Sequence, residues 1–168
     1  MRARLSTRRN ALRAVLAVIV VGLLAIGLLT NAASARRHAP PLPIRMLSGQ
    51  PTTLSDLHGH PAVIVFWASW CPGCRDEARA VERFARSRAG RGRVVAVDYS
   101  DGGNWRAFLR DYGWSFPVFA DPDGTLGDSF RIHSLPSTVF LDADGRIAST
   151  SPTPQTATSL ASGLSGAA

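Results

Sequence analysis

Lysine is absent from this 168-residue chain, and arginine supplies all 19 of its basic side chains. Acidic residues are missing from residues 1–37, which hold seven of the arginines. The other 12 arginines are balanced by the 12 acids of the chain, so the net charge of +7 belongs to the amino terminus. Because the remainder is neutral, the composition gives little support for a phosphate-binding surface, and we expect no nucleic-acid partner.

Cysteine is scarce: Cys71 and Cys74 are the two in the chain, and two residues separate them. A structural zinc site needs about four ligands, and the chain adds only four histidines to this pair. We therefore expect no metal, with copper held by the pair and His133 as a minor alternative. A purely structural bridge would close too short a loop to stabilise the chain by much. A redox couple is the better interpretation of the pair.

Charge is also absent from residues 14–30, a mostly apolar run that follows five arginines. With residues 31–33 the run approaches the roughly 20 residues that span a bilayer. The positive-inside rule would carry everything after residue 35 across the membrane. We predict that residues 1–35 are an uncleaved membrane anchor, or a signal peptide that is cut after Ala35. Either alternative puts the globular part outside the cytoplasm, where disulfides persist.

The segments at the two ends of the folded region have biased compositions. Residues 36–43, RRHAPPLP, are rich in proline and are predicted to be a stiff linker. Residues 150–168 are uncharged and mostly small, and only Leu160 and Leu164 could hold a weak final helix there. We expect this tail to be poorly ordered. Residues 44–149 are then one domain, with enough chain for its own core.

Strand and helix patterns alternate within that domain. Residues 62–67 form a continuous apolar run, typical of a strand buried on both faces of a parallel sheet, and residues 74–88 have the apolar spacing of a helix. The later predicted elements are a strand at 94–98, a helix at 104–112, a short strand at 117–120, a short helix at 125–131 and a hairpin of 137–141 with 146–149. This order predicts an α/β fold with a mixed central sheet and helices on both faces.

The cysteines lie where the first buried strand meets the first helix. Positions i and i+3 of a helix are about 5 to 6 Å apart, within the Cα separation that a disulfide allows. Because the start of a helix favours negative charge, we expect Cys71 to be an accessible, stabilised thiolate that exchanges with partners. Cys74 points toward the core and would release the partner by attacking the mixed disulfide.

A family resemblance supports this chemistry. The sequence FWASWCPGCRDEA, preceded by LSDLHGHPAVIV and followed by FPVFADPDG and LPSTVFLDADGRI, resembles the TlpA/ResA-like branch of the thioredoxin-fold family. The similarity runs from about Leu47 to Ile147. It implies a thioredoxin-like fold and a membrane-tethered enzyme of the extracytoplasmic space. Such an enzyme exchanges disulfides through Cys71 and Cys74 and needs no cofactor beyond that pair.

The resemblance also implies a cis peptide bond before the late strand, which by position is the bond to Pro136. The sequence alone allows an ordinary trans proline equally well. A cis bond would set Leu135 beside Cys71, with backbone groups that can pair with a partner peptide. We also place Trp70, Pro72 and Gly73 at the partner-binding surface, although Trp70 could simply shield the start of the helix.

Glu77 shares a helix face with Cys74. If it is buried there, its pKa would rise and it could exchange a proton with Cys74. The alternative is a solvated acid that only favours the helix dipole. The resemblance, which has an acid at this spacing, favours the first role. Because Val65 stands where thioredoxins carry an acid, Glu77 is the only nearby candidate, and Ala68 stands where a related peroxidase would need threonine.

The direction of electron flow is the least determined property. Pro72-Gly73 inverts the Gly-Pro order of thioredoxins and lacks the histidine of oxidising members, which favours a reductant. The resemblance implies a monomer that reduces cysteine-containing exported proteins, with cytochrome c maturation as one case, using a membrane electron donor. Two alternatives stay open: an exported oxidase that makes disulfides, and a tethered module that binds copper or client proteins without catalysis.

Overall fold

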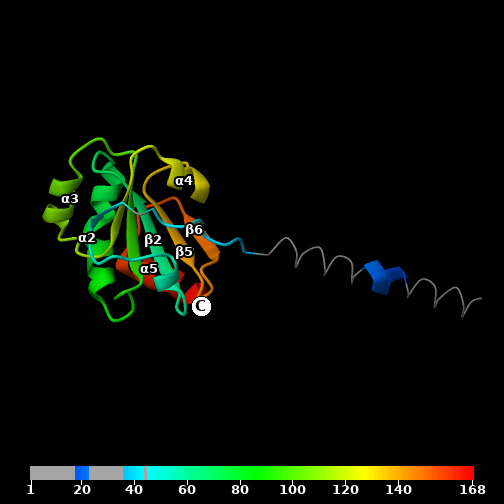
Figure 1. Ribbon diagram of the computed structural model, residues 1–168. Helices are drawn as coiled ribbons and strands as arrows, with labels where there is room; N and C mark the ends of the chain where they lie inside the picture. The colour runs from blue at the N-terminus through cyan, green and yellow to red at the C-terminus, as the bar shows by residue number, and fades with distance from the viewer. Residues whose placement is uncertain (1–17, 23–35, 44) are drawn as a thin grey trace, which may run out of the picture. The chain divides into compact units, whose positions relative to one another are not determined.

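The computed structural model describes residues 18–22, 36–43 and 45–168 (Figure 1). It divides into two units, Met1–Arg36 and Arg37–Ala168. In the first unit, residues 18–22 are helical. The anchor or signal peptide predicted for residues 1–35 otherwise lies outside the described residues. None of the helices in the described part of the chain is long and apolar enough to cross a membrane.

The second unit is built on a six-stranded mixed sheet with the strand order β1-β4-β3-β2-β5-β6. Parallel pairing joins β2 to β3 and β3 to β4, whereas β1, β5 and β6 each run antiparallel to a neighbour. The strands are β1 (Met46–Ser48), β2 (Ala62–Trp67), β3 (Val94–Tyr99), β4 (Val118–Asp121), β5 (Ser137–Leu141) and β6 (Ile147–Ser151). The helices are η1 (Ser55–Leu57), α2 (Pro72–Arg86), α3 (Trp105–Tyr112), α4 (Thr125–Phe130) and α5 (Ala157–Gly166).

The central strand β2 is buried at all six positions because its two faces supply two different cores. Val63, Val65 and Trp67 face a core that also contains side chains of α2, α3 and α5. Ile64 and Phe66 face a second core, to which η1 and the end of α4 contribute. The prediction of a mixed sheet with helices on both faces is confirmed (Figure 1).

The proline-rich segment at residues 36–43 is not a free linker. The Arg37 guanidinium donates hydrogen bonds of 3.1 and 2.9 Å to two carbonyl oxygens at the end of α4. The Ala39 N–H donates to the Gly145 carbonyl at 3.0 Å, and the Ile147 N–H donates to the Arg37 carbonyl at 2.8 Å. The linker prediction is therefore wrong for residues 37–39, because their backbone pairs beside the β5–β6 hairpin.

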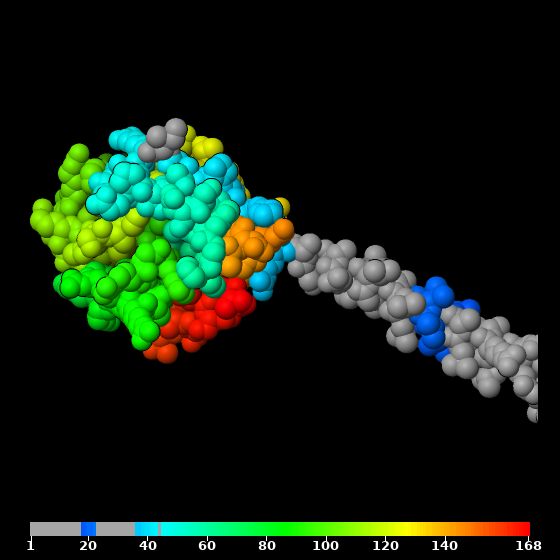
Figure 2. Space-filling view, turned by 60° about the horizontal axis from the view of Figure 1, so that its bottom comes forward, coloured from blue at the N-terminus to red at the C-terminus, as the bar shows by residue number. Residues whose placement is uncertain are grey.

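The carboxy-terminal segment is also ordered, contrary to the prediction. Thr156 and Ser159 form a capping box at the start of α5, so the backbone N–H groups of both residues are satisfied. Leu160 and Leu164 are buried in the core shared with α2. Figure 2 shows this segment, in red, packed on the body of the domain. The cap and the two leucines outweigh the poor helix propensity of the glycines and serines.

We predict that Leu160→Ala destabilises the domain by about 2 to 5 kcal/mol, because the leucine is fully buried and its removal leaves a cavity. Urea denaturation followed by circular dichroism measures the change. Ser162→Ala, at an exposed position of the same helix, is the control and should change the free energy of unfolding by less than about 0.5 kcal/mol. Equal effects of the two substitutions would mean that α5 is not part of the cooperative fold.

Candidate active site

The two cysteines occupy the first turn of α2. The helix begins at Pro72, two residues before the predicted start, because proline is well tolerated at the first helical position. Cys71 is the N-cap residue, and its Sγ accepts a hydrogen bond of 3.2 Å from the Cys74 N–H. The two residues form a disulfide, with a Cα separation of 5.3 Å. In the reduced chain, the same N–H would stabilise a thiolate at Cys71.

Cys71 is less accessible than expected. Its exposed fraction is 3%, against 0% for Cys74. The prediction that Cys71 lies open to solvent is therefore wrong for the disulfide form, although Cys71 is the outer of the two. One cause is the close approach of two prolines to the turn: a Cβ at Gly73 would lie 3.1 Å from Pro136 Cδ and 3.4 Å from Pro154 Cγ. A side chain here would fit only if the Pro136 ring shifted by a few tenths of an ångström.

The Leu135–Pro136 peptide bond is cis, as the family resemblance implies. The following strand, β5, pairs antiparallel with β2, and Ser137 lies opposite Phe66. This register carries Pro136 to the end of β2 from which the cysteine turn departs. Leu135 is half-buried and packs against both cores. Its pairing with a partner peptide stays a prediction.

Glu77 is buried, with 2% of its surface exposed. Its Oε2 accepts a hydrogen bond of 2.7 Å from the Gln155 N–H, whereas its Oε1 has no partner in the described structure. Burial raises the pKa of Glu77, and the hydrogen bond from Gln155 lowers it by a smaller amount. The resulting pKa is about 7. Cys74 and Glu77 are both buried residues of α2. The solvated alternative is therefore wrong, and proton exchange between Glu77 and Cys74 stays a prediction.

Gln155 was not predicted as part of the site. It is 7% exposed, and its Nε2 donates to Ser151 Oγ at 2.8 Å and to the Thr153 carbonyl at 2.7 Å. Its Oε1 accepts from Ser159 Oγ at 2.8 Å. Through these bonds the segment between β6 and α5 is fixed against Glu77. No local pattern predicts this contact, because it joins residues 78 positions apart.

Asp98 of β3 is a second buried acid, and it was not predicted as part of the site. Asp98 is 4% exposed and lies opposite Trp67 in the pairing of β3 with β2. Burial, the negative charge of Asp101 and a hydrogen bond with Asp101 together raise the pKa of Asp98 to about 8. A charged residue inside the apolar run VVAVDY was the available signal for this carboxyl.

The surface beside the cysteine turn is partly aromatic. Trp70 is 56% exposed and borders a groove of about 340 Å³, which Phe108 and Tyr112 of α3 also line. Arg75 and Asp111 contribute charges to the same groove. The structure thus places Trp70 where it can contact a partner, and Pro72 and Gly73 lie next to it at the start of α2.

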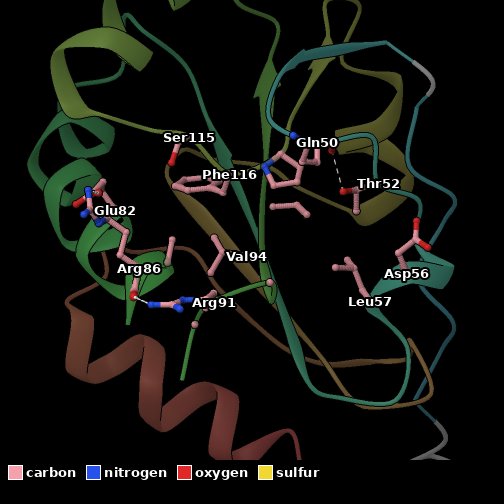
Figure 3. Close-up of a pocket in the computed structure, with 15 residues that line it drawn as sticks. Gln50, Thr52, Asp56, Leu57, Glu82, Arg86, Arg91, Val94, Ser115 and Phe116 are labelled. Atoms are coloured by element: carbon pink, nitrogen blue, oxygen red, sulfur yellow. Dashed lines mark hydrogen bonds and ion pairs between the residues drawn. The ribbon is translucent and has the colours of Figure 1, made fainter. Parts of the chain in front are cut away.

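A larger cavity lies at the other end of the sheet (Figure 3). Its volume is about 510 Å³, and Val94 at the start of β3 lines it together with Glu82, Arg86 and Phe116. Val94 pairs with Val63 at the start of β2, whereas the cysteine turn follows the end of β2. No cysteine lines this cavity. It is therefore separate from the exchange site.

Metal-ligating side chains do not gather around the site. Across the described residues, no group of three or more histidine, cysteine, aspartate and glutamate side chains is placed to hold a metal ion.

Comparison with known proteins agrees with this geometry. The model of the AhpC/TSA family matches residues 35–150. The chain belongs to this thioredoxin-like family. Among curated proteins, the thioredoxin-like protein YneN of Bacillus subtilis is 34% identical over 115 residues, which cover 66% of this chain and 67% of the relative. The thiol-disulfide oxidoreductase ResA of Bacillus subtilis is 28% identical over 111 residues, which cover 65% and 62% of the two chains.

Solved structures of this AhpC/TSA-type fold are also similar. A secreted disulfide oxidoreductase of Mycobacterium tuberculosis, homologous to DsbE of E. coli, superposes with a TM-score of 0.61 at 26% identity. The match covers 76% of this chain and 95% of that structure. The aligned region spans 57% to 67% of the length of the first curated relatives. The similarity therefore covers most of the folded unit.

Proposed function

We propose that the chain is a thiol-disulfide oxidoreductase that works outside the cytoplasm and reduces disulfides in exported proteins. The observation that carries the proposal is the Cys71–Cys74 disulfide at the start of α2, beside the cis bond to Pro136. The relatives named as thiol-disulfide oxidoreductase and secreted disulfide oxidoreductase support it. The predicted export segment supports the location.

The proposed reaction begins with the reduced chain. The Cys71 thiolate attacks one sulfur of a client disulfide, the client S–S bond breaks, and the other client sulfur leaves as a thiolate that takes up a proton. Cys74 then gives its proton to Glu77 and attacks Cys71 Sγ. This second step breaks the bond between Cys71 and the client and forms the Cys71–Cys74 bond, and the client sulfur leaves as a thiolate that takes up a proton. Two electrons have moved to the client, and the chain is oxidised.

A complete cycle needs an electron donor that reduces Cys71–Cys74 again. A membrane thiol protein is the donor that we propose, and the chain would act as a monomer held at, or secreted from, the outer face of the membrane. Apocytochrome c before haem attachment is one proposed client, because its cysteines must be reduced before they bind haem. Trp70 and the backbone at Leu135 would bind the client segment around its cysteine.

The reduction potential of the Cys71–Cys74 couple tests the direction of flow. We predict a value near or below about −250 mV, measured by equilibrating the chain with thiol buffers and counting free thiols by mass spectrometry. A value near about −120 mV would instead identify an exported oxidase. A chain whose disulfide does not equilibrate with any thiol buffer would contradict both directions and favour a non-enzymatic binding module.

A further inference from the structure

The loop before Cys71 is held by Asp101. The two oxygens of this carboxylate accept from two backbone N–H groups: Oδ2 from Ser69 at 2.6 Å and Oδ1 from Gly103 at 2.7 Å. Ser69 is two residues before Cys71, so its position limits where the cysteine sulfur can lie. Asp101 is 9% exposed, which makes these charge-assisted bonds stronger than they would be in water.

Ser69 is fixed on its other sides as well. Its Oγ accepts from the Asn104 N–H at 3.1 Å, and its carbonyl accepts from Arg75 Nε and Nη2 at 3.0 and 2.6 Å. The loop therefore joins the start of α3, the first turns of α2 and the carboxylate of Asp101. Among these partners of Ser69, Asp101 is the one that lies beside a second acid.

That second acid is Asp98. It lies on the face of β3 that carries Val94 and Ala96, because alternate residues of a strand share a face, and this is the core that also holds both cysteines. Its side chain lines the same small cavity as that of Asp101, and its Oδ1 is buried without a partner among the residues described. Two carboxylates that line one small buried cavity cannot both be ionised without a large cost, so one proton is retained by the pair.

The other groups around the pair do little to stabilise a second negative charge. A small cavity of about 40 Å³, enough for about one water molecule, touches both carboxyl groups. Arg45 is the cation that lines it, and Arg45 is exposed. The facing residues from β1, α3 and β4 are Leu47, Trp105 and Ala120, none of which is charged. Arg75 reaches the site only through the Ser69 carbonyl.

We propose that Asp98 and Asp101 are a positioning pair for Cys71, in which one shared proton keeps Asp101 bound to the Ser69 N–H. The pairing of Asp98 with Asp101 does not depend on the proposed exchange function. Only its effect on the reactivity of Cys71 rests on that function. Loss of the proton puts a second negative charge next to Asp101, the pair moves apart or admits water, and the Ser69 bond weakens. The pKa of Asp98, about 8, places this change just above neutral pH.

The test is a pH titration of the Ser69 amide resonance in the oxidised, ¹⁵N-labelled full chain. The disulfide has no titrating thiols, and a Glu77→Gln background removes the other buried carboxyl group whose pKa is raised to near neutral. We expect the Ser69 amide to shift with a midpoint near pH 8. Asp98→Asn can still donate a hydrogen bond to Asp101 but cannot ionise, so the shift should be lost while the resonance keeps its low-pH position.

Asp121→Asn is the matched control. Asp121 is also 4% exposed and also accepts from two backbone N–H groups, those of Leu126 and Gly127, but it makes no bond to Ser69. Its titration curve should match that of the parent chain. A Ser69 amide that does not titrate between pH 7 and 9 in the parent chain would overturn the proposal without any variant. A midpoint that survives in Asp98→Asn would overturn it as well.

The functional consequence is measured separately on the reduced chain. The rate at which iodoacetamide alkylates Cys71 should show an inflection near pH 8 that is absent from Asp98→Asn and present in Asp121→Asn. Identical pH profiles for the parent chain and Asp98→Asn would show that the pair does not position Cys71. Since the amide titration needs no exchange activity, failure of the proposed function and failure of this inference give different results.

Discussion

Replacing Cys71 with serine lowers turnover of a disulfide peptide by at least about a thousandfold, because serine at neutral pH provides no thiolate to attack the peptide. The assay follows release of a fluorescent thiol while excess dithiothreitol regenerates the chain. Cys74→Ser is the matched substitution three residues away. Measured without dithiothreitol, which would itself reduce the mixed disulfide, this variant should release one thiol per chain and then stop, whereas Cys71→Ser should release none. The difference arises because Cys71 acts on the partner and Cys74 acts on Cys71.

The outcome that contradicts these roles is specific. If Cys71→Ser kept more than about a tenth of the turnover, another group would be attacking the peptide. Circular dichroism of both variants serves as the control for folding. Each loses the same short-range bridge, so both should lose similar stability.

Glu77→Gln is expected to slow release of the partner by about a hundredfold near pH 7, the lower end of the range for general acid–base catalysis. Glutamine has a similar shape but cannot take the proton that Cys74 must lose. Stopped-flow measurement of the second step, from mixed disulfide to Cys71–Cys74, tests this effect. Glu82→Gln, on the same helix and paired on the surface with Arg86, is the control and should leave the rate unchanged.

The same substitution should also change how stability depends on pH. Folding raises the pKa of Glu77, so the unfolded chain ionises near pH 4.5 while the folded chain holds its proton to about pH 7. The contribution of this carboxyl to stability is therefore fully present below about pH 4.5 and falls as the pH rises to about 7, by on the order of 3 kcal/mol. Glu77→Gln should remove that loss, and Glu82→Gln should retain it. Urea titrations at pH 4.5 and 7.5 measure the free energy of unfolding of each chain. If it depended on pH in the same way in Glu77→Gln and the parent chain, Glu77 would be ionised in the folded chain.

Local patterns predicted the part of the fold that positions the cysteines. The apolar run at 62–67 is β2, and the apolar spacing after Cys74 is α2, because both elements bury side chains in a pattern set by their own geometry. The redox pair followed from the placement of Cys71 and Cys74 at this junction. The cis bond to Pro136 came only from the family resemblance, since the sequence at 135–136 allows both isomers.

Contacts between distant segments were the part that could not be predicted. The pairing of Arg37 with Ile147 depends on where the β5–β6 hairpin lies, and the order of α5 depends on the core that receives Leu160. The raised pKa of Asp98 depends on β3 being an interior strand and on Asp101 folding back beside it. Neither fact is encoded in the residues next to Asp98.

Cys71 is the residue whose sulfur we expect to attack the partner, even though only 3% of it is exposed in the disulfide form. The direct measurement compares the single-cysteine chains Cys74→Ser and Cys71→Ser. Each is mixed with a disulfide peptide at pH 7, and mass spectrometry follows formation of the mixed disulfide. The account predicts that Cys71 forms the mixed disulfide at least about a hundredfold faster than Cys74. Equal rates, or a faster reaction at Cys74, would contradict it.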